Sequence, residues 1–215
     1  MATKRFDNIS PEKKTALLET ARKAFIENGF EGTSLNDILK NAGMSKGLFY
    51  YYFEDKADLF STVIAEAFAP YSAFLDTVGD VGSAMEYWRE LEKFYRKIAE
   101  MLSENPDIAR LGMGFVQIMM SHTPPQVMVD LVSLYRQKTA ELVEKGRLAG
   151  AVTTDIPDDL LLDLLNSIGQ TLDIWSFAHM KIISDLDIRL HTKLSIELFK
   201  CIAGLRINSL PRGLV

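Results

Sequence analysis

Apolar residues recur every three or four positions along almost the whole chain, which predicts a protein built of α-helices. The first helix is expected to begin at Pro11 after a capping Ser10, because a missing N–H costs nothing in the first turn. Gly29 is expected to end this helix, since glycine readily adopts the left-handed conformation of helix ends. The one β-like stretch, residues 151–154, is short and is interpreted as a connector. The pattern therefore predicts an all-α fold.

Capping residues, glycines and prolines separate the further helices. They are predicted over residues 35–41, 46–53, 56–77, 83–103, 107–121, 125–148, 157–181 and 184–207. This gives about nine helices in all. We expect a three-helix N-terminal domain over residues 1–55 and a larger helical domain over residues 56–215.

Composition is that of an ordinary globular protein, with 47% apolar and 25% charged residues. The single cysteine, Cys201, excludes an internal disulfide and any CxxC metal or redox site. The longest mostly apolar stretch, residues 108–120, contains Arg110 and is well short of the roughly 20 residues that a membrane span requires. The N-terminus has no apolar core of the kind found in signal peptides. We therefore expect a cytoplasmic protein that does not bind membranes.

Charge is distributed unevenly along the chain. The net charge is −5, which by itself argues against a nucleic-acid partner. Residues 1–56, however, contain 9 Lys and Arg against 8 Asp and Glu, a net charge of +1, so the acidity lies in the rest of the chain. A nearly neutral segment can still present a basic face if its charges are segregated.

Residues 35–52 have the pattern of a helix-turn-helix unit, with two short helices on either side of Gly43. Such a unit places the start of its second helix in the major groove of DNA. In that helix Lys46 can bind guanine or a phosphate, Gly47 allows close approach and Leu48 can touch a thymine methyl group. The following three tyrosines point about 100° apart, so at least one is expected to be exposed and able to hold a phosphate.

The stretch from Gly43 to Phe60, GMSKGLFYYYFEDKADLF, resembles the signature of the tetracycline-repressor (TetR) family of bacterial transcriptional regulators. Upstream, Ala21, Phe25, Gly29-Phe30 and Gly32-Thr33-Ser34 also match positions of that family. The resemblance implies a homodimeric DNA-binding regulator, usually a repressor, with a variable ligand-binding domain. The residues expected at the DNA are Thr33, Ser34, Ser45, Lys46, Gly47, Leu48, Tyr50, Tyr51, Tyr52 and Lys56. Two positions depart from the family pattern, Leu39 in place of a small Ala and Tyr52 in place of a common His.

The helices predicted over residues 157–181 and 184–207 are apolar nearly all round. Such helices are buried on more than one side. We expect them to pack against the same helices of a second copy in a homodimer. Burial in the core of a monomer is the alternative.

The middle of the chain is rich in methionine and aromatic residues, which suit an adaptable apolar pocket for a small-molecule effector. The candidate ligand-binding residues are Trp88, Met113, Gln117, Met120, Asn166, Gln170, Asp173, Trp175 and Phe177. Residue by residue, an ordinary hydrophobic core is the stronger interpretation. Asp159 and Asp163 are expected on a solvated face.

No catalytic motif is present, and the three histidines are far apart in sequence, so we expect no enzyme activity, no metal and no cofactor. The sequence predicts a homodimeric repressor that binds a palindromic operator in double-stranded DNA. A small, largely apolar effector of unknown identity would release it. The alternative is a helical small-molecule-binding protein that no longer reads DNA, which the net acidity and the departures at Leu39 and Tyr52 support.

Overall fold

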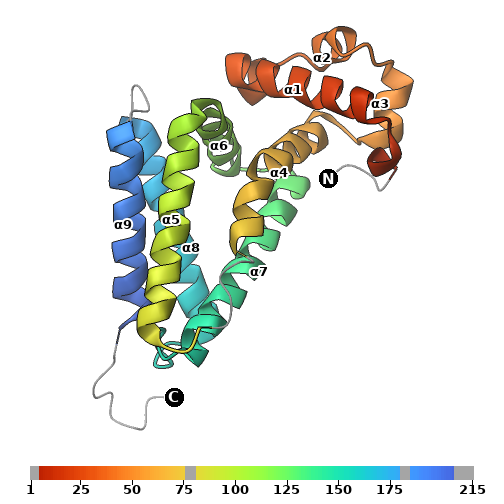
Figure 1. The fold of residues 1–215 in the computed structure, drawn as a ribbon. Helices are drawn as coiled ribbons and strands as arrows, with labels where there is room; N and C mark the ends of the chain where they lie inside the picture. Colours follow the sequence, from red (N-terminus) through yellow and green to blue (C-terminus); the bar gives the residue numbers. More distant parts are fainter. Residues whose placement is uncertain (1–4, 76–80, 180–184, 206–215) are drawn as a thin grey trace. The chain divides into compact units, whose positions relative to one another are not determined.

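The computed structural model describes residues 5–75, 81–179 and 185–205, and their side chains except those of residues 71, 72, 74, 75, 173, 176–179 and 185–188. Over these ranges the chain forms a 3-10 turn and nine helices, with no strand, which confirms the all-α prediction (Figure 1). The elements are η1 (Phe6–Asn8), α1 (Pro11–Gly32), α2 (Leu35–Asn41), α3 (Lys46–Tyr52), α4 (Lys56–Leu75), α5 (Ala84–Glu104), α6 (Pro106–Met119), α7 (Gln126–Leu148), α8 (Asp158–His179) and α9 (Asp185–Ala203).

The predicted helix boundaries agree with the structure within two residues, except at two C-terminal ends. Gly29 has a left-handed φ of 67° and interrupts α1 as predicted, but a further helical turn extends the element to Gly32. The last helix is predicted too long, because α9 ends at Ala203 and Gly204 begins a turn. Residues 206 and 207 of that predicted helix lie outside the described residues. The same holds for residues 76 and 77 of the helix predicted over 56–77 and for residues 180 and 181 of the helix predicted over 157–181.

Spatial contacts divide the chain into two compact units. Unit 1 comprises residues 1–70 and 105–134, and unit 2 comprises residues 71–104 and 135–215, so that α4 and α7 contribute to both. The boundary predicted between residues 55 and 56 divides a DNA-binding domain from a ligand-binding and dimerisation domain. The spatial units do not test this functional division, which stays a prediction.

Unit 1 is built on α1, with α2 and α6 packed against it. The apolar residues Leu17, Ala21 and Phe25, which recur at helical spacing, are the buried residues of α1. Phe30 folds back beyond Gly29, and its ring lies 6.2 Å from that of Phe25 and 5.4 Å from that of Phe60 on α4. The carboxylate of Asp55 accepts the N–H of Asp58 at 2.8 Å and caps α4.

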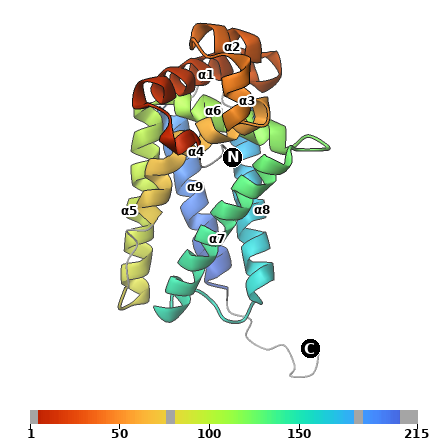
Figure 2. The same cartoon turned by 90° about the vertical axis from the view of Figure 1, so that its right-hand side faces the viewer.

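Unit 2 is a helical bundle in which α9 lies against both α5 and α8 (Figure 2). Tyr87 is fully buried in its core and donates its hydroxyl hydrogen to the carbonyl of Leu142 at 3.2 Å. Burial raises the pKa of the Tyr87 hydroxyl, so this group remains a donor. The buried core of the bundle consists of Tyr87, Leu91, Phe94, Leu142, Val143, Ala151, Val152, Ile156, Leu161, Leu165, Phe199 and Ala203.

Candidate nucleic-acid interface and effector region

The turn between α2 and α3 is built on Gly43. Its φ of 64° lies in the left-handed region, which strains residues with a side chain. The N–H of Gly43 donates to the carbonyl of Lys40 at 3.3 Å, and the N–H of Met44 donates to that of Leu39 at 2.9 Å. These bonds satisfy the last carbonyls of α2, so the chain can turn into α3 within four residues.

A serine caps each of these two helices. The hydroxyl oxygen of Ser34 accepts the N–H of Asp37, and that of Ser45 accepts the N–H of Leu48, both at 3.3 Å. A hydroxyl that accepts one bond can still donate its own hydrogen. Both exposed serines can therefore also bind an oxygen of a partner molecule.

The inner faces of α2 and α3 form the small core that fixes the angle between them. The buried residues are Ile38, Leu39, Met44, Phe49 and Phe53. The rings of Phe49 and Phe53 stack with their centroids 5.2 Å apart. Leu39, which departs from the family pattern, belongs to this core and is only 3% exposed.

The outer face of α3 is polar and open. Lys46 and Gly47 are exposed, Tyr50 is 59% exposed and Tyr51 is 51% exposed. This confirms that the three consecutive tyrosines do not share one core, whereas Tyr52 is partly buried. A Cβ atom at Gly47 would have no neighbour within 4 Å, so the free protein does not require glycine there.

Two other residues expected at the DNA have partners within the protein. Thr33 is 4% exposed, and its hydroxyl lies 3.0 Å from the carbonyl of Ala24 and 2.5 Å from that of Gly29. The ammonium of Lys56 donates to the carbonyls of Phe30 at 2.7 Å and Thr33 at 3.1 Å. Both side chains therefore stabilise the end of α1, a role that the sequence did not predict.

The N-terminal segment is a part of this surface that sequence reasoning missed. Phe6 in η1 is 2% exposed, and its ring contacts those of Tyr52 and Phe53 at the end of α3. Arg5 lies over the ring of Tyr51, with 4.8 Å from its guanidinium carbon to the ring centroid. An apolar pair at i and i+3, Phe6 and Ile9, within a polar leader was the available signal.

Comparison with known proteins agrees with this geometry. The model of the family described as bacterial regulatory proteins, tetR family, matches residues 17–63, which include α2 and α3. The chain is 31% identical over 147 residues to the HTH-type transcriptional regulator RutR of Escherichia coli O157:H7, covering 64% of this chain and 65% of RutR. The chain belongs to the TetR family.

Other relatives extend the similarity beyond α3. The HTH-type transcriptional repressor DhaR of Mycobacterium sp. (strain GP1) is 25% identical over 152 residues, covering 69% of this chain and 74% of DhaR. SmeT, the repressor of a Stenotrophomonas maltophilia multidrug efflux pump, has the same fold, with a TM-score of 0.69 at 14% identity over 95% of this chain and 100% of SmeT. As a TetR-family member the protein is a transcriptional regulator and not an enzyme.

The candidate effector residues of this TetR-family chain are divided between the two units. Met113, Gln117 and Met120 belong to unit 1 and the other six to unit 2. Met120 and Trp175 are well exposed, at 59% and 45%. The side chains of Asp173 and Phe177 lie outside the described residues.

Two of these candidates, Trp88 and Asn166, are at least partly buried within unit 2. Trp88 is partly buried, and its ring lies 6.0 Å from that of Phe199. The side-chain nitrogen of Asn166 is buried and has no hydrogen-bond partner in the described part of the chain. Asp159 and Asp163 are exposed, as expected of a solvated face, and Arg136 binds Asp163 at 2.6 Å.

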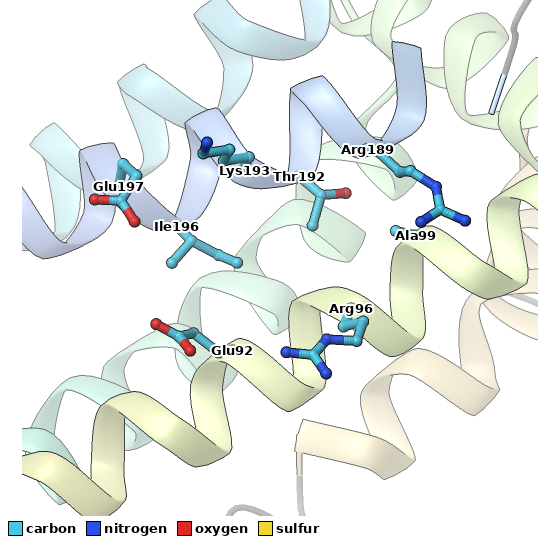
Figure 3. Close-up of a pocket in the computed structure, with 8 residues that line it drawn as sticks. All are labelled: Glu92, Arg96, Ala99, Arg189, Thr192, Lys193, Ile196 and Glu197. Carbon is cyan, nitrogen blue, oxygen red and sulfur yellow. The ribbon is translucent and has the colours of Figure 1, made fainter. Parts of the chain in front are cut away.

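Unit 2 also contains a groove of about 320 Å³ between α5 and α9, which includes none of the candidate effector residues. Figure 3 shows Arg96 and Arg189 toward one end and Glu92 and Glu197 toward the other. Lys200 forms ion pairs with both glutamates. The groove is thus lined largely by charged side chains, unlike the apolar pocket expected from the sequence.

Metal and membrane sites receive no support from the described residues. Over these ranges, no group of three or more His, Cys, Asp or Glu side chains could hold a metal ion. None of the helices described is both long and apolar enough to span a bilayer.

Proposed function

We propose that this protein is a homodimeric repressor that acts in the cytoplasm and binds a palindromic operator in double-stranded DNA. The observation that carries the proposal is the outer face of α3, where Lys46, Gly47, Tyr50 and Tyr51 are exposed above a buried helix-turn-helix core. Large aromatic side chains beside a cation, left open to solvent, are suited to a charged partner.

The residues of α3 have distinct proposed roles. Lys46 and Leu48 read base edges in the major groove, and the open space at Gly47 lets the backbone approach the DNA. Ser34, Ser45, Tyr50, Tyr51 and Tyr52 donate hydroxyl hydrogens to phosphate oxygens. Thr33 and Lys56 complete the proposed contact set, with their side chains also holding the end of α1.

Dimerisation through α8 and α9 is supported by an exposed apolar stripe. On α8, Leu160, Leu164 and Trp175 fall within about 60° of one another around the helix axis and are 50%, 37% and 45% exposed. On α9, Leu190 is 47% exposed. A second copy that covers these side chains would bury them and bring two α3 helices to the two half-sites of a palindrome.

Release by a small, largely apolar effector is the last part of the proposal. The buried, unpartnered amide of Asn166 is a group that a ligand could satisfy, since buried polar atoms normally have partners. An effector releases the operator only if it prefers the conformation that does not bind DNA, and a coupling of about 1–3 kcal/mol is typical. Because α4 has residues in both units, we propose it as the element that transmits this preference.

The deciding experiment is selection of bound duplexes from a random pool. The wild type is expected to enrich a palindrome, and a Lys46→Ala, Tyr50→Ala double variant is expected to lose it. Gly47→Ala offers a sharper test, because it adds one methyl group in open space within α3 and should leave the melting temperature unchanged or raise it slightly, while weakening operator binding.

Failure of the folded, dimeric wild type to enrich any sequence would reject DNA recognition. The protein would then be a helical small-molecule-binding protein. Effector action is tested separately, by measuring operator affinity with and without a bound compound. A compound that binds tightly but leaves operator affinity unchanged would show that it is not the effector.

A further inference from the structure

The N-terminal segment is fixed onto the end of α3 by an aromatic anchor. The ring of Phe6 lies 4.7 Å from that of Phe53 at 62° and 5.6 Å from that of Tyr52 at 63°, both edge-on geometries. The ammonium of Lys14 on α1 lies 5.5 Å from the centre of the same ring. Phe6 is therefore held by both α1 and α3, and the residue before it has a defined position.

That preceding residue is Arg5, which is exposed and lies over Tyr51. A guanidinium group above an aromatic face is attracted to the ring, and its N–H donors remain directed outward in its own plane. Within the described part of the chain, no carboxylate forms an ion pair with Arg5. Its charge is thus oriented but not neutralised.

The position of Arg5 matters because the proposed DNA-binding face has few cations. The sequence of α3 contains a single basic residue, Lys46, near its start. Tyr51, which lies under Arg5, belongs to the set proposed to hold phosphates. Arg5 adds a positive charge at the opposite end of the helix from Lys46.

We propose that Arg5 binds the phosphate backbone of the operator, positioned by the ring of Tyr51 and by the anchoring of Phe6. This inference rests on the proposed DNA binding through α3. Arginine suits the role because its planar fork matches two phosphate oxygens while its face stacks on an aromatic ring. The contact orients and strengthens binding without reading bases.

The test is the salt dependence of operator binding for Arg5→Gln, with Lys93→Gln as the control. Lys93 is an exposed cation of unit 2, paired with Glu90, so its removal changes net charge equally. Each lost phosphate contact lowers the absolute slope of log K against log salt by about 0.9, so that the salt dependence becomes shallower. We expect Arg5→Gln to lower the absolute slope by roughly 1.8 for a dimer and the affinity at 0.1 M salt by at least about tenfold. The control should change neither.

A second variant separates positioning from folding. Phe6→Ala removes the anchor and should reduce the absolute slope of log K against log salt in the same way, with Arg5 still present. Arg5→Gln should leave the sequence selected from the random pool unchanged. The tag used for purification should be at the C-terminus, because the N-terminus is part of the tested surface.

The outcomes distinguish this inference from the proposed function. A wild type that binds no operator would reject the proposed function itself. A wild type with a steep salt slope that Arg5→Gln does not alter would reject the role of Arg5 alone. A lower melting temperature with an unchanged slope would show that Arg5 only stabilises the fold, and an altered selected sequence would show that it reads bases instead of phosphates.

Discussion

At the scale of single residues, Lys56 has a role that its position alone does not reveal. Its ammonium donates to the carbonyls of Phe30 and Thr33, and it lies 4.5 Å from the centre of the Phe30 ring. The last carbonyls of a helix have no partners within the helix, so a cation at that end stabilises it. Lys56 at the start of α4 thereby ties the end of α1 to the next helical segment.

Replacing Lys56 with Met keeps the aliphatic stem and removes the ammonium. We expect Lys56→Met to lower the free energy of unfolding by about 1–3 kcal/mol, because hydrogen bonds to charged groups are lost. Urea unfolding at pH 7 measures the change. Lys40→Met, at an exposed lysine of α2, is the control and should stay within about 0.5 kcal/mol of the wild type. Unchanged stability with a lower salt slope would instead assign Lys56 to the phosphates.

At the scale of elements, the segment between α7 and α8 is a buried part of the unit 2 core and not a solvated loop. Ala151, Val152 and Thr153 are at most 5% exposed. Arg147 holds the segment by donating to the carbonyls of Thr153 at 3.2 Å and Ile156 at 3.1 Å, and it also pairs with Asp158. The sequence identified a connector here, but not that it fills the core.

Gly146 allows this connector to pack. A Cβ atom there would overlap a methyl of Val152 and lie 2.7 Å from the ring of Tyr87, and both of these side chains are buried. We expect Gly146→Ala to destabilise the protein by about 1–3 kcal/mol, because overpacking outweighs the better helix propensity of alanine.

Gly169→Ala is the matched control for Gly146→Ala. Gly169 lies inside α8, and a Cβ atom there would have no neighbour within 4 Å. The variant should be neutral or more stable by up to about 1 kcal/mol. Urea unfolding of both variants is the measurement, and equal stabilities would contradict the packing argument.

At the scale of the whole molecule, assembly is the property on which the proposed function depends. The helical positions of Leu164 and Trp175 on α8 and of Cys201 on α9 leave these side chains exposed in the single chain. An apolar stripe of this kind is characteristic of an interface with a partner. Cys201, the chain's single cysteine, provides a site for chemical labelling.

Leu164→Glu should produce a monomer at concentrations at which the wild type is a dimer, because a buried, unpaired carboxylate is costly. Sedimentation measures the oligomeric state, and the reaction of Cys201 with a thiol reagent should be slow in the dimer and fast in the variant. Leu148→Glu, at an 80% exposed position of α7, is the control and should remain a dimer. A dimeric Leu164→Glu variant would place the interface elsewhere.

Features specified by neighbouring residues could be predicted from the sequence. The left-handed glycines at 29 and 43, the capping serines at 34 and 45, and the buried inner face of α2 and α3 follow from local spacing and backbone geometry. For the same reason the exposure of Tyr50 and Tyr51 could be predicted, since consecutive side chains on a helix cannot share one face.

Only the tertiary structure decided what residues distant in the sequence do to one another. It brings Lys56 to the end of α1, Phe6 to the end of α3 and Tyr87 against Gly146. These contacts join positions that are tens of residues apart, and no local period encodes which of many similar apolar or charged residues will meet. The sequence by itself therefore determined the helices and the DNA-binding motif, whereas packing between helices decided which polar groups remain available for a partner and which stabilise the fold.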